Sequence, residues 1–378
     1  MKILHLLGAT DDIGGILSVL RNVQTATASR AIQHLVWVNQ TYREVRRPAL
    51  TYRVSRHLLD ESSSHLRLLV GALRALPELK RTLAAEPCEI LHAHSRGSLM
   101  LAAGVAALWR RPVLFTNHAY ARRRGLYRWA ARRRHLRTAV LTPNMARHYG
   151  LKTGPGGAEI ISECCADRFF ELPCVPRGQR DRGAPLRLVG LGNIFHWKKW
   201  HLVVEAMARL TDGERRRVEF HHWGPVPNSP EAAACNTDLR RLIQDRQVAD
   251  RCHLHGLSLS VEEPLREADL FVLPSTNEPC SVALIEALAL GLPALVSASG
   301  GNVDIVQPDR TGLLFEPDQP DSLRDCLRRV LRGEFKPAAP AEIRASVRHR
   351  CASAVADEYC RRYDEMVRSP AAQPRAGG

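Results

Sequence analysis

Short apolar runs rich in valine, isoleucine and leucine recur along the 378-residue chain, and longer segments with a helical spacing of apolar residues separate them. This alternation is typical of βα units, whose strands are buried in a parallel sheet. In the first half the predicted strands are Lys2–Leu7, Leu35–Val38, Ile90–Ala93, Val113–Thr116 and Ala139–Thr142. In the second half they are Leu186–Leu191, Val218–His222, Cys252–His255, Leu270–Pro274, Ala294–Ser297 and Leu313–Phe315. Predicted helices between them include His201–Leu210, Thr237–Gln247, Ser281–Leu290 and Pro320–Leu331.

The length of the chain and one break in this pattern indicate two domains. An N-terminal Rossmann-like domain over residues 1–173 and a C-terminal one over 186–340 are joined by a linker, 174–185, which contains proline, glycine and charge without apolar periodicity. Residues 341–367 are predicted to form helices that pack back toward the N-terminal domain, and 368–378 a disordered tail. The fold class is therefore α/β, with two Rossmann-like domains facing each other across a cleft and ligands at the carboxyl ends of the strands.

The net charge of +15 lies entirely in the first half of the chain. Residues 1–170 hold 26 Lys and Arg against 11 Asp and Glu, whereas residues 171–378 hold 28 of each. Such a positive field attracts anionic surfaces, among them lipid headgroups, nucleic acid and acidic polymers. Because no nucleic-acid-binding motif accompanies the charge, nucleic acid is not expected as a partner.

Two carboxylates follow the predicted strand Leu270–Pro274. Glu278 precedes Pro279, which is well suited to open a helix, and Glu286 lies about two turns further along. A carboxylate at the mouth of a helix can accept hydrogen bonds from sugar hydroxyls, and the first amides of the helix suit a phosphate. The plain alternative is a capping glutamate and a solvated helix glutamate.

A lysine pair, Lys198 and Lys199, follows the predicted strand Leu186–Leu191 in a loop. Cations beside a diphosphate neutralise the charge that grows as a leaving group departs. A solvated pair on a surface loop is the alternative.

The stretch from 277 to 293 resembles the E-x7-E motif of glycosyltransferase family 4, a retaining, metal-independent family with the GT-B fold. The resemblance continues upstream through 268–275 and downstream through the Gly-Gly turn in 299–306 and the T-G-x-L sequence of 311–314. Residues 186–332 follow the family pattern in order and spacing, and the first half follows it more loosely.

The resemblance implies roles for the residues around the motif. Glu278 would bind the hydroxyls of the donor sugar, and Glu286 the ribose. Cys280 and Ser281 stand where the family has an aromatic residue and a glycine, so the approach of the backbone to the sugar is altered here. Together with Val282 they would line the donor site.

The resemblance also extends to the phosphate side. Lys198 stands where the family has its phosphate lysine, but Asn193 stands where the family has an arginine, so one of the two usual cations is replaced. Lys199 is expected to assist Lys198. The expected catalytic residues are Glu278, Lys198 and the strand-end histidine His118.

In the first half, which would be the acceptor side, Gly14 and Gly15 match the family's glycine loop and would contact the donor diphosphate or the reacting sugar. His118 ends a predicted strand and matches the family's strand-end histidine, near the transferred sugar. His94 ends another predicted strand and is a candidate for lining the acceptor side.

Arginines provide a candidate membrane contact. Arg124, Arg128 and Arg132 have i, i+4 spacing and would share one helix face against anionic headgroups. The alternative is a solvated helix. Asp11 and Asp12 follow the first apolar run, which favours a strand over a signal peptide, and no apolar run approaches the ~20 residues of a membrane span.

These features predict a retaining glycosyltransferase, cytoplasmic and peripheral on the inner membrane face, that moves a sugar from a nucleotide-sugar donor to a glycan or lipid-linked acceptor in polysaccharide or glycolipid synthesis. No cofactor is expected beyond the nucleotide sugar as co-substrate, and no metal, since no D-x-D or His/Cys ligand cluster stands where a diphosphate needs one. Rival interpretations are another GT-B enzyme, such as a phosphorylase or a nucleotide-sugar epimerase, and a catalytically idle scaffold, which Asn193 allows. The motifs leave the donor base, the sugar and the acceptor open.

Overall fold

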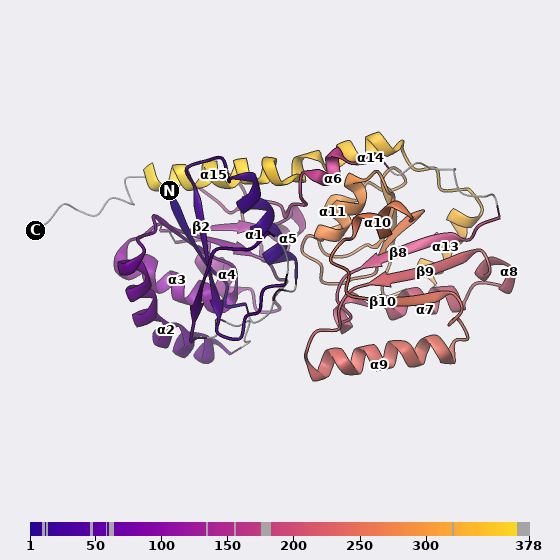
Figure 1. The fold of residues 1–378 in the computed structure, drawn as a ribbon, viewed down its shortest axis with the longest axis horizontal. Coiled ribbons are helices and arrows are strands. Elements are labelled where there is room, and N and C mark those ends of the chain that lie inside the picture. The colour runs from indigo at the N-terminus through magenta and orange to yellow at the C-terminus, as the bar shows by residue number, and fades with distance from the viewer. Residues whose placement is uncertain are drawn as a thin grey trace, which may run out of the picture. The chain divides into compact units, whose positions relative to one another are not determined.

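The computed structural model describes residues 1–368 apart from 10, 11, 13, 46, 47, 58, 60–63, 134, 155, 175–182 and 320. The chain forms two compact units, each a parallel sheet with helices packed on it (Figure 1). The N-terminal unit comprises Met1–Glu163 and the C-terminal helix α15 (Ala352–Arg368), and the C-terminal unit comprises Cys164–Cys351.

The sheet of the N-terminal unit has the strand order β3-β2-β1-β4-β5-β6-β7, and every neighbouring pair is parallel. Its strands are β1 (Lys2–Leu6), β2 (Gln33–Asn39), β3 (Tyr52–Ser55), β4 (Ile90–Ala93), β5 (Val113–Asn117), β6 (Leu136–Val140) and β7 (Glu159–Ile160). Its other helices are α1 (Gly15–Ala26), α2 (His65–Ala85), α3 (Arg96–Trp109), α4 (Gly125–Ala130) and α5 (Pro143–Tyr149). Because the strand order reverses between β1 and β4, the carboxyl ends of these two strands mark a switch point, where open α/β sheets bind ligands.

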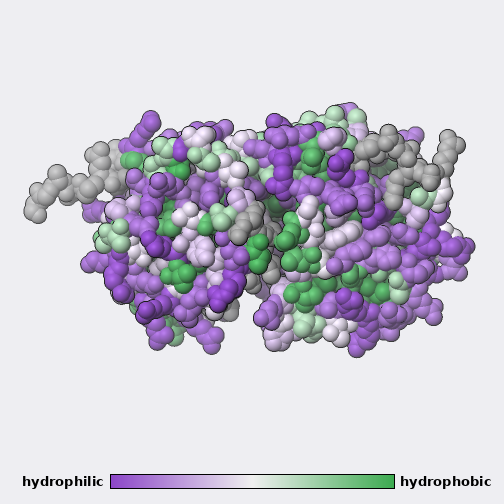
Figure 2. Space-filling model, in the orientation of Figure 1, coloured by the Kyte–Doolittle hydropathy of each residue, from purple (hydrophilic) through white to green (hydrophobic). Residues whose placement is uncertain are grey.

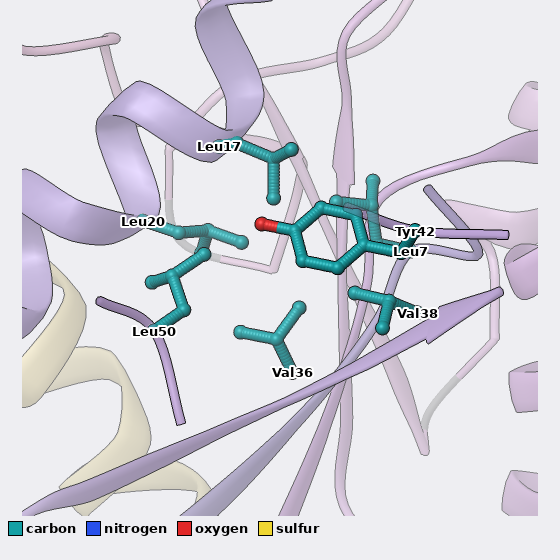
Figure 3. Packing of buried hydrophobic residues seen from close by; sticks show 7 residues of the cluster. All are labelled: Leu7, Leu17, Leu20, Val36, Val38, Tyr42 and Leu50. Carbon is teal, nitrogen blue, oxygen red and sulfur yellow. The ribbon is translucent and has the colours of Figure 1, made fainter. Parts of the chain in front are cut away.

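Apolar side chains from α1 and β2 build one part of the core of this unit. Leu17 and Leu20 of α1 point toward Val36 and Val38 of β2, and Tyr42 closes the same cluster (Figure 3). Burying a leucine or valine side chain contributes ~1.5–3 kcal/mol, so this cluster holds α1 firmly on the sheet. Helix α1, which begins at Gly15, is thereby held on the sheet.

The sheet of the C-terminal unit has the strand order β10-β9-β8-β11-β12-β13, again with parallel neighbours. Its strands are β8 (Leu186–Leu191), β9 (Val218–Trp223), β10 (Cys252–Gly256), β11 (Leu270–Leu273), β12 (Ala294–Ser297) and β13 (Gly312–Phe315). Its helices are α6 (Arg168–Glu171), α7 (His201–Ala208), α8 (Asp212–Arg215), α9 (Pro230–Asp245), α10 (Glu262–Arg266), α11 (Val282–Ala289), α12 (Asn302–Ile305), α13 (Ser322–Leu331) and α14 (Pro340–Ser346), with 3₁₀ turns η1 (His196–Lys198) and η2 (Arg348–Arg350). The switch point of this sheet lies between β8 and β11.

The predicted strands are present, and the differences have local causes. The strand expected at Ala139–Thr142 runs instead from Leu136 to Val140, because the Thr142 side chain caps α5 by accepting a hydrogen bond from the Met145 amide. The short strands β3 and β7 were not predicted, since β7 has two residues and β3 is mostly exposed.

Helix starts differ more than strand positions. Helix α9 begins at Pro230 rather than Thr237, with Ser229 as its cap. Helix α11 begins at Val282, where Ser281 accepts a hydrogen bond from the Leu284 amide, so Pro279 does not open the helix as predicted. A serine cap accepts a hydrogen bond from an amide in the first turn of the helix. A proline in the first turn has no amide N–H to donate, so it makes no such bond.

The chain passes between the two units at other positions than the predicted domain boundaries. Residues 164–173 lie in the C-terminal unit, where Phe169 and Phe170 of α6 are buried. Helix α15 belongs to the N-terminal unit, where the Tyr363 hydroxyl bonds to His92. Of the expected linker 174–185, residues 175–182 lie outside the described residues, as does nearly all of 368–378.

Candidate functional site

The central feature of the C-terminal unit is an ion pair at its switch point. Lys198 lies in the loop after β8, Glu278 lies in the loop after β11, and Lys198 Nζ is 2.5 Å from Glu278 Oε2. The two side chains are 15% and 14% exposed, so both charged groups can be reached from solvent. Two opposite charges at adjacent strand ends suit a ligand that carries both an anionic and a hydroxyl-rich part.

The loop that carries Lys198 is anchored to the sheet. The Gly192 amide donates to Trp223 O at 3.0 Å, and the buried Trp200 indole donates to Asn193 O at 3.0 Å. Gly192 has φ 144°, and a Cβ there would lie 3.5 Å from Lys198 Cε, so the lysine side chain passes over this glycine. Lys199 adopts a left-handed conformation (φ 56°) that ends η1 and separates its direction from that of Lys198.

The loop that carries Glu278 is held by the Gly-Gly turn after β12. Gly300 has φ 60°, and a Cβ there would lie 2.4 Å from Glu278 O, so only glycine fits. The Gly301 amide donates to Glu278 O at 2.8 Å, and the Ser299 hydroxyl donates to Thr276 O. The Thr276 amide in turn donates to Trp197 O at 3.2 Å, which ties the Lys198 loop to the Glu278 loop.

Cys280 and Glu286 lie beside a different segment of the same unit. Cys280 is buried and accepts a hydrogen bond from Arg350 Nη1 at 3.6 Å. Glu286 is half-buried on α11; burial, reinforced by the Glu286 charge, raises the pKa of the Cys165 thiol. Ser281 is buried as the cap of α11, and Val282 is its first residue. Cys280 is therefore part of the interior, and Ser281 and Val282 form the amino end of α11.

In the N-terminal unit, four histidines form a hydrogen-bonded row. His118 Nδ1 is 2.8 Å from Glu163 Oε1, and His118 Nε2 is 3.1 Å from His94 Nδ1. The row continues from His94 Nε2 to His5 Nδ1 at 3.0 Å and from His5 Nε2 to His34 Nδ1 at 2.9 Å. Both ring nitrogens of His118 are thus engaged, and a ligand would have to replace one of these bonds.

Burial sets the charge of this histidine row. It lowers the pKa of His5 and His94 well below 6.5 and that of His34 to about 4, because the charged form loses its hydration. His92 packs against the row, bonds to Thr116 and Tyr363, and has its pKa lowered in the same way. The imidazoles of His5, His34, His92 and His94 are therefore neutral at neutral pH.

Sequence reasoning missed most of the row. His5, His34 and Glu163 are far apart in the chain and meet only through strand pairing. His5 lies opposite His92 in the register of β1 and β4. The available signal was a histidine on each of several neighbouring apolar strands.

The glycine loop of the N-terminal unit is held by a buried ion pair. Gly14 precedes α1 with φ 113° and open space where a Cβ would be, and Gly15 is the first residue of the helix. Asp12 is 2.6 Å from Arg21 of α1, which also pairs with Glu44 at 3.0 Å. Asp12 therefore fixes the loop beside Gly14. Ile13 lies outside the described residues.

The arginines expected to share one helix face do not do so. Helix α4 spans only Gly125–Ala130, so Arg124 precedes it and Arg132 follows it. Arg128 donates from Nε to Tyr149 O at 2.8 Å, which directs its side chain toward α5. The spacing prediction was wrong because the helix is shorter than the basic segment.

A different helix exposes apolar side chains at helical spacing. On α2, Leu66, Leu69, Val70 and Leu73 are exposed at positions i, i+3, i+4 and i+7. Hydrophobic residues otherwise form separate patches in the mostly hydrophilic surface seen in Figure 2. Within the described residues, no helix is both long enough and apolar enough to cross a membrane.

Part of the C-terminal unit is similar in sequence to a known protein family. Residues 179–349 match the family model described as glycosyl transferases group 1. We call these residues the group 1 segment. Lys198, Glu278 and the Gly-Gly turn all lie within this group 1 segment.

Two curated relatives that match this chain are named as a glycosyltransferase and a glucosyltransferase. The chain is 27% identical over 45% of its length to the putative colanic acid biosynthesis glycosyltransferase WcaL of Escherichia coli, and covers 42% of that protein. It is 26% identical over 75% of its length to the 2-deoxystreptamine glucosyltransferase of Streptomyces kanamyceticus, and covers 79% of that protein. The chain thus spans less than half the length of the first of these relatives.

Solved structures match nearly the whole chain. Sucrose-phosphate synthase from Thermosynechococcus elongatus has a TM-score of 0.80 at 17% identity, covering 97% of this chain and 99% of that one. Anabaena HepE, solved in complex with UDP-glucose, has a TM-score of 0.73 at 16% identity, covering 97% of this chain and 100% of that one. The prediction of a GT-B fold with two Rossmann-like parallel sheets is confirmed.

Proposed function

We propose that this protein is a retaining, metal-independent glycosyltransferase whose nucleotide-sugar donor binds at the Lys198–Glu278 pair. The observation that carries the proposal is the position of this pair, at the switch point of the group 1 segment and partly exposed. The complex of the structurally similar HepE with UDP-glucose supports a nucleotide sugar as the donor class.

The two side chains would serve different parts of the donor. The Lys198 ammonium would neutralise the diphosphate as it leaves, and the Glu278 carboxylate would accept hydrogen bonds from sugar hydroxyls. Without a donor the two groups satisfy each other, at 2.5 Å. Donor binding would exchange that ion pair for one bond to each part of the ligand.

The surrounding residues would assist. Ser281 and Val282 begin α11, whose first amides suit a phosphate, and Lys199 adds positive charge nearby. Asn193 would contribute backbone rather than charge, since its carbonyl anchors Trp200. Glu286 would bind the ribose. In the N-terminal unit, Gly14 and Gly15 would approach the donor, and His118 with His94 would lie on the side of a glycan or lipid-linked acceptor.

Transfer to a lipid-linked acceptor would place the protein on the inner membrane face. The exposed row on α2 and the positive charge of the first half support contact with an anionic bilayer. Arg124, Arg128 and Arg132 are exposed and would add charge, although not from one helix face. We expect vesicle binding that weakens with salt and is lost when Leu66, Leu69 and Leu73 become glutamine, with exposed Leu108→Gln as the control. Binding unaffected by the triple change would exclude α2 as the contact.

The experiment that tests the proposed function is a panel of nucleotide sugars assayed for hydrolysis and transfer. We expect one donor class to react, and Glu278→Ala to lower turnover at least tenfold in a folded protein, because unpaired hydroxyls in the site cost ~1–3 kcal/mol. Glu231→Ala, on the exposed start of α9, is the control. Wild-type rates in Glu278→Ala would reject the assignment. If the protein neither binds nor transfers any donor, the result would favour the catalytically idle scaffold that Asn193 permits.

A further inference from the structure

Strand pairing at the edge of the C-terminal sheet brings together three potential metal ligands. The edge strand β10 lies beside β9 (Figure 1). His221 of β9 and His253 of β10 are register partners, so their side chains share one face of the sheet. Glu219 lies two residues before His221 and so projects to the same face. One potential ligand atom from each of the three lies within 4.8 Å of the others, and all three residues are half-buried.

Each of two ligands directs one donor atom inward and holds the other in a hydrogen bond. His221 Nε2 is 3.5 Å from Glu219 Oε2 and is buried without a hydrogen bond among the described residues. His221 Nδ1 is 3.0 Å from His255 Nε2, and Glu219 Oε1 accepts from Arg251 Nη1 at 3.1 Å. Metal-binding histidines and carboxylates are characteristically oriented by such outer partners.

We propose that Glu219, His221 and His253 bind a divalent transition metal of the zinc class, at a site separate from the Lys198–Glu278 pair. Imidazole and carboxylate ligands suit zinc. Ligand atoms about 2.0–2.2 Å from a tetrahedral ion lie roughly 3.3–3.5 Å apart, which agrees with the separation of His221 Nε2 and Glu219 Oε2. Partial exposure leaves room for water as the fourth ligand and a path for the ion.

The local charges permit the ion. Arg187 is paired with Glu267 at 2.7 Å. Arg251 is paired with Glu219 and, at 3.2 Å, with Asp250, so the two neighbouring cations are compensated.

The N-terminal unit has a second histidine group, but its geometry does not favour a metal. His5, His92 and His94 also place one nitrogen each within 4.8 Å of one another. All six of their ring nitrogens are within hydrogen-bond distance of a partner, the site is buried, and no carboxylate is among the three. A divalent ion would have to break these bonds and remain uncompensated. Among the described residues, the Glu219–His221–His253 cluster has free ligand atoms and includes a carboxylate, so neither difficulty applies to it. A metal bound there would link β10 to β9.

The test is zinc binding to the full chain after treatment with a chelator. Titration against a chromophoric chelator should give one tight ion per chain, and Co²⁺ should give the intense visible absorption of a tetrahedral site. Glu219→Gln, His221→Gln and His253→Gln should each weaken zinc binding by more than tenfold. His255→Gln, which removes an outer partner, should weaken it about 10- to 100-fold. His65→Gln, on the exposed start of α2, should change nothing.

Thermal unfolding supplies a second readout, because zinc should raise the Tm of the wild type and of His65→Gln but not of the three ligand variants. Glu219→Gln keeps the shape of the side chain, so it remains informative if a histidine variant fails to fold. The proposal is overturned if the wild type binds no zinc. It is equally overturned if the folded Glu219 and His221 variants bind zinc as the wild type does.

Discussion

Both units order their strands so that the first strand lies beside the fourth, yet the two switch points hold different chemistry. In the C-terminal unit, between β8 and β11, Lys198 and Glu278 are partly exposed and pair with each other. In the N-terminal unit, between β1 and β4, His5 and His94 are buried and bonded on both ring nitrogens. The shared topology determines where a ligand could bind, and the side chains determine whether the position is open.

A second contrast concerns what fixes the loops at these positions. In the C-terminal unit, the Glu278 loop is fixed by backbone hydrogen bonds to the Gly300–Gly301 turn. In the N-terminal unit, the buried ion pair with Arg21 fixes Asp12 to α1, the helix that follows Gly14. Because the Glu278 loop is anchored through its backbone, the charged side chain remains available to a ligand. In the Asp12–Arg21 pair, the charged side chains themselves form the anchoring contact.

The largest effect is expected from breaking that buried pair. Arg21→Met removes the guanidinium that pairs with buried Asp12 and half-buried Glu44, which should lower the free energy of unfolding by about 3–5 kcal/mol. Urea unfolding monitored by circular dichroism measures it. Arg241→Met, which removes an exposed pair with Asp238, should cost at most ~1 kcal/mol. If both variants lost the same free energy of unfolding, the buried pair would not be the anchor that distinguishes the N-terminal unit.

The next largest effect concerns catalysis at the open switch point. Lys198→Ala should reduce turnover about 10²-fold or more, on the order of losing one preorganised electrostatic contact. Initial rates at saturating donor measure it, with the exposed Lys336→Ala as the control. Full activity in Lys198→Ala would mean that the diphosphate is stabilised elsewhere.

A smaller effect is expected from pH. The pKa of His94 is lowered in the folded state, mainly by burial, so the unfolded chain binds its proton more readily. The stability that neutral His94 provides is fully present above about pH 6.5 and is lost as the pH falls below that value. Its share of the slope is about 1.4 kcal/mol per pH unit.

Removing that histidine should therefore flatten the pH dependence. Urea unfolding between pH 6.5 and 5 should show a shallower loss of stability in His94→Gln than in the wild type. Exposed His65→Gln should leave the slope unchanged. An unchanged slope in His94→Gln would show that the row is hydrated or charged in solution.

The sequence predicted the sheets well because buried parallel strands are continuous apolar runs. The positions of Lys198 and Glu278 after strands could be predicted for the same reason, since each follows such a run. Their roles in donor binding come from the motif and stay a prediction. Their direct contact was not predicted, because it depends on β8 and β11 lying side by side.

The failures share a physical cause. The histidine row and the Glu219–His221–His253 cluster are assembled by strand register, which spacing along one chain does not contain. The arginine face failed because α4 ends at Ala130, and the role of Pro279 failed because Ser281 provides the cap. Helix ends depend on a few local hydrogen bonds that compete closely with one another.

The most direct test of the central claim, that Lys198 serves the diphosphate and Glu278 the sugar, is the affinity for a nucleoside diphosphate without a sugar. UDP, GDP and ADP would be titrated calorimetrically into the wild type and into Lys198→Ala and Glu278→Ala. Lys198→Ala should weaken binding at least tenfold. Glu278→Ala should leave it unchanged or tighten it, because the carboxylate that competes for Lys198 is gone. Equal weakening by both substitutions, or no effect of either, would contradict this division of roles.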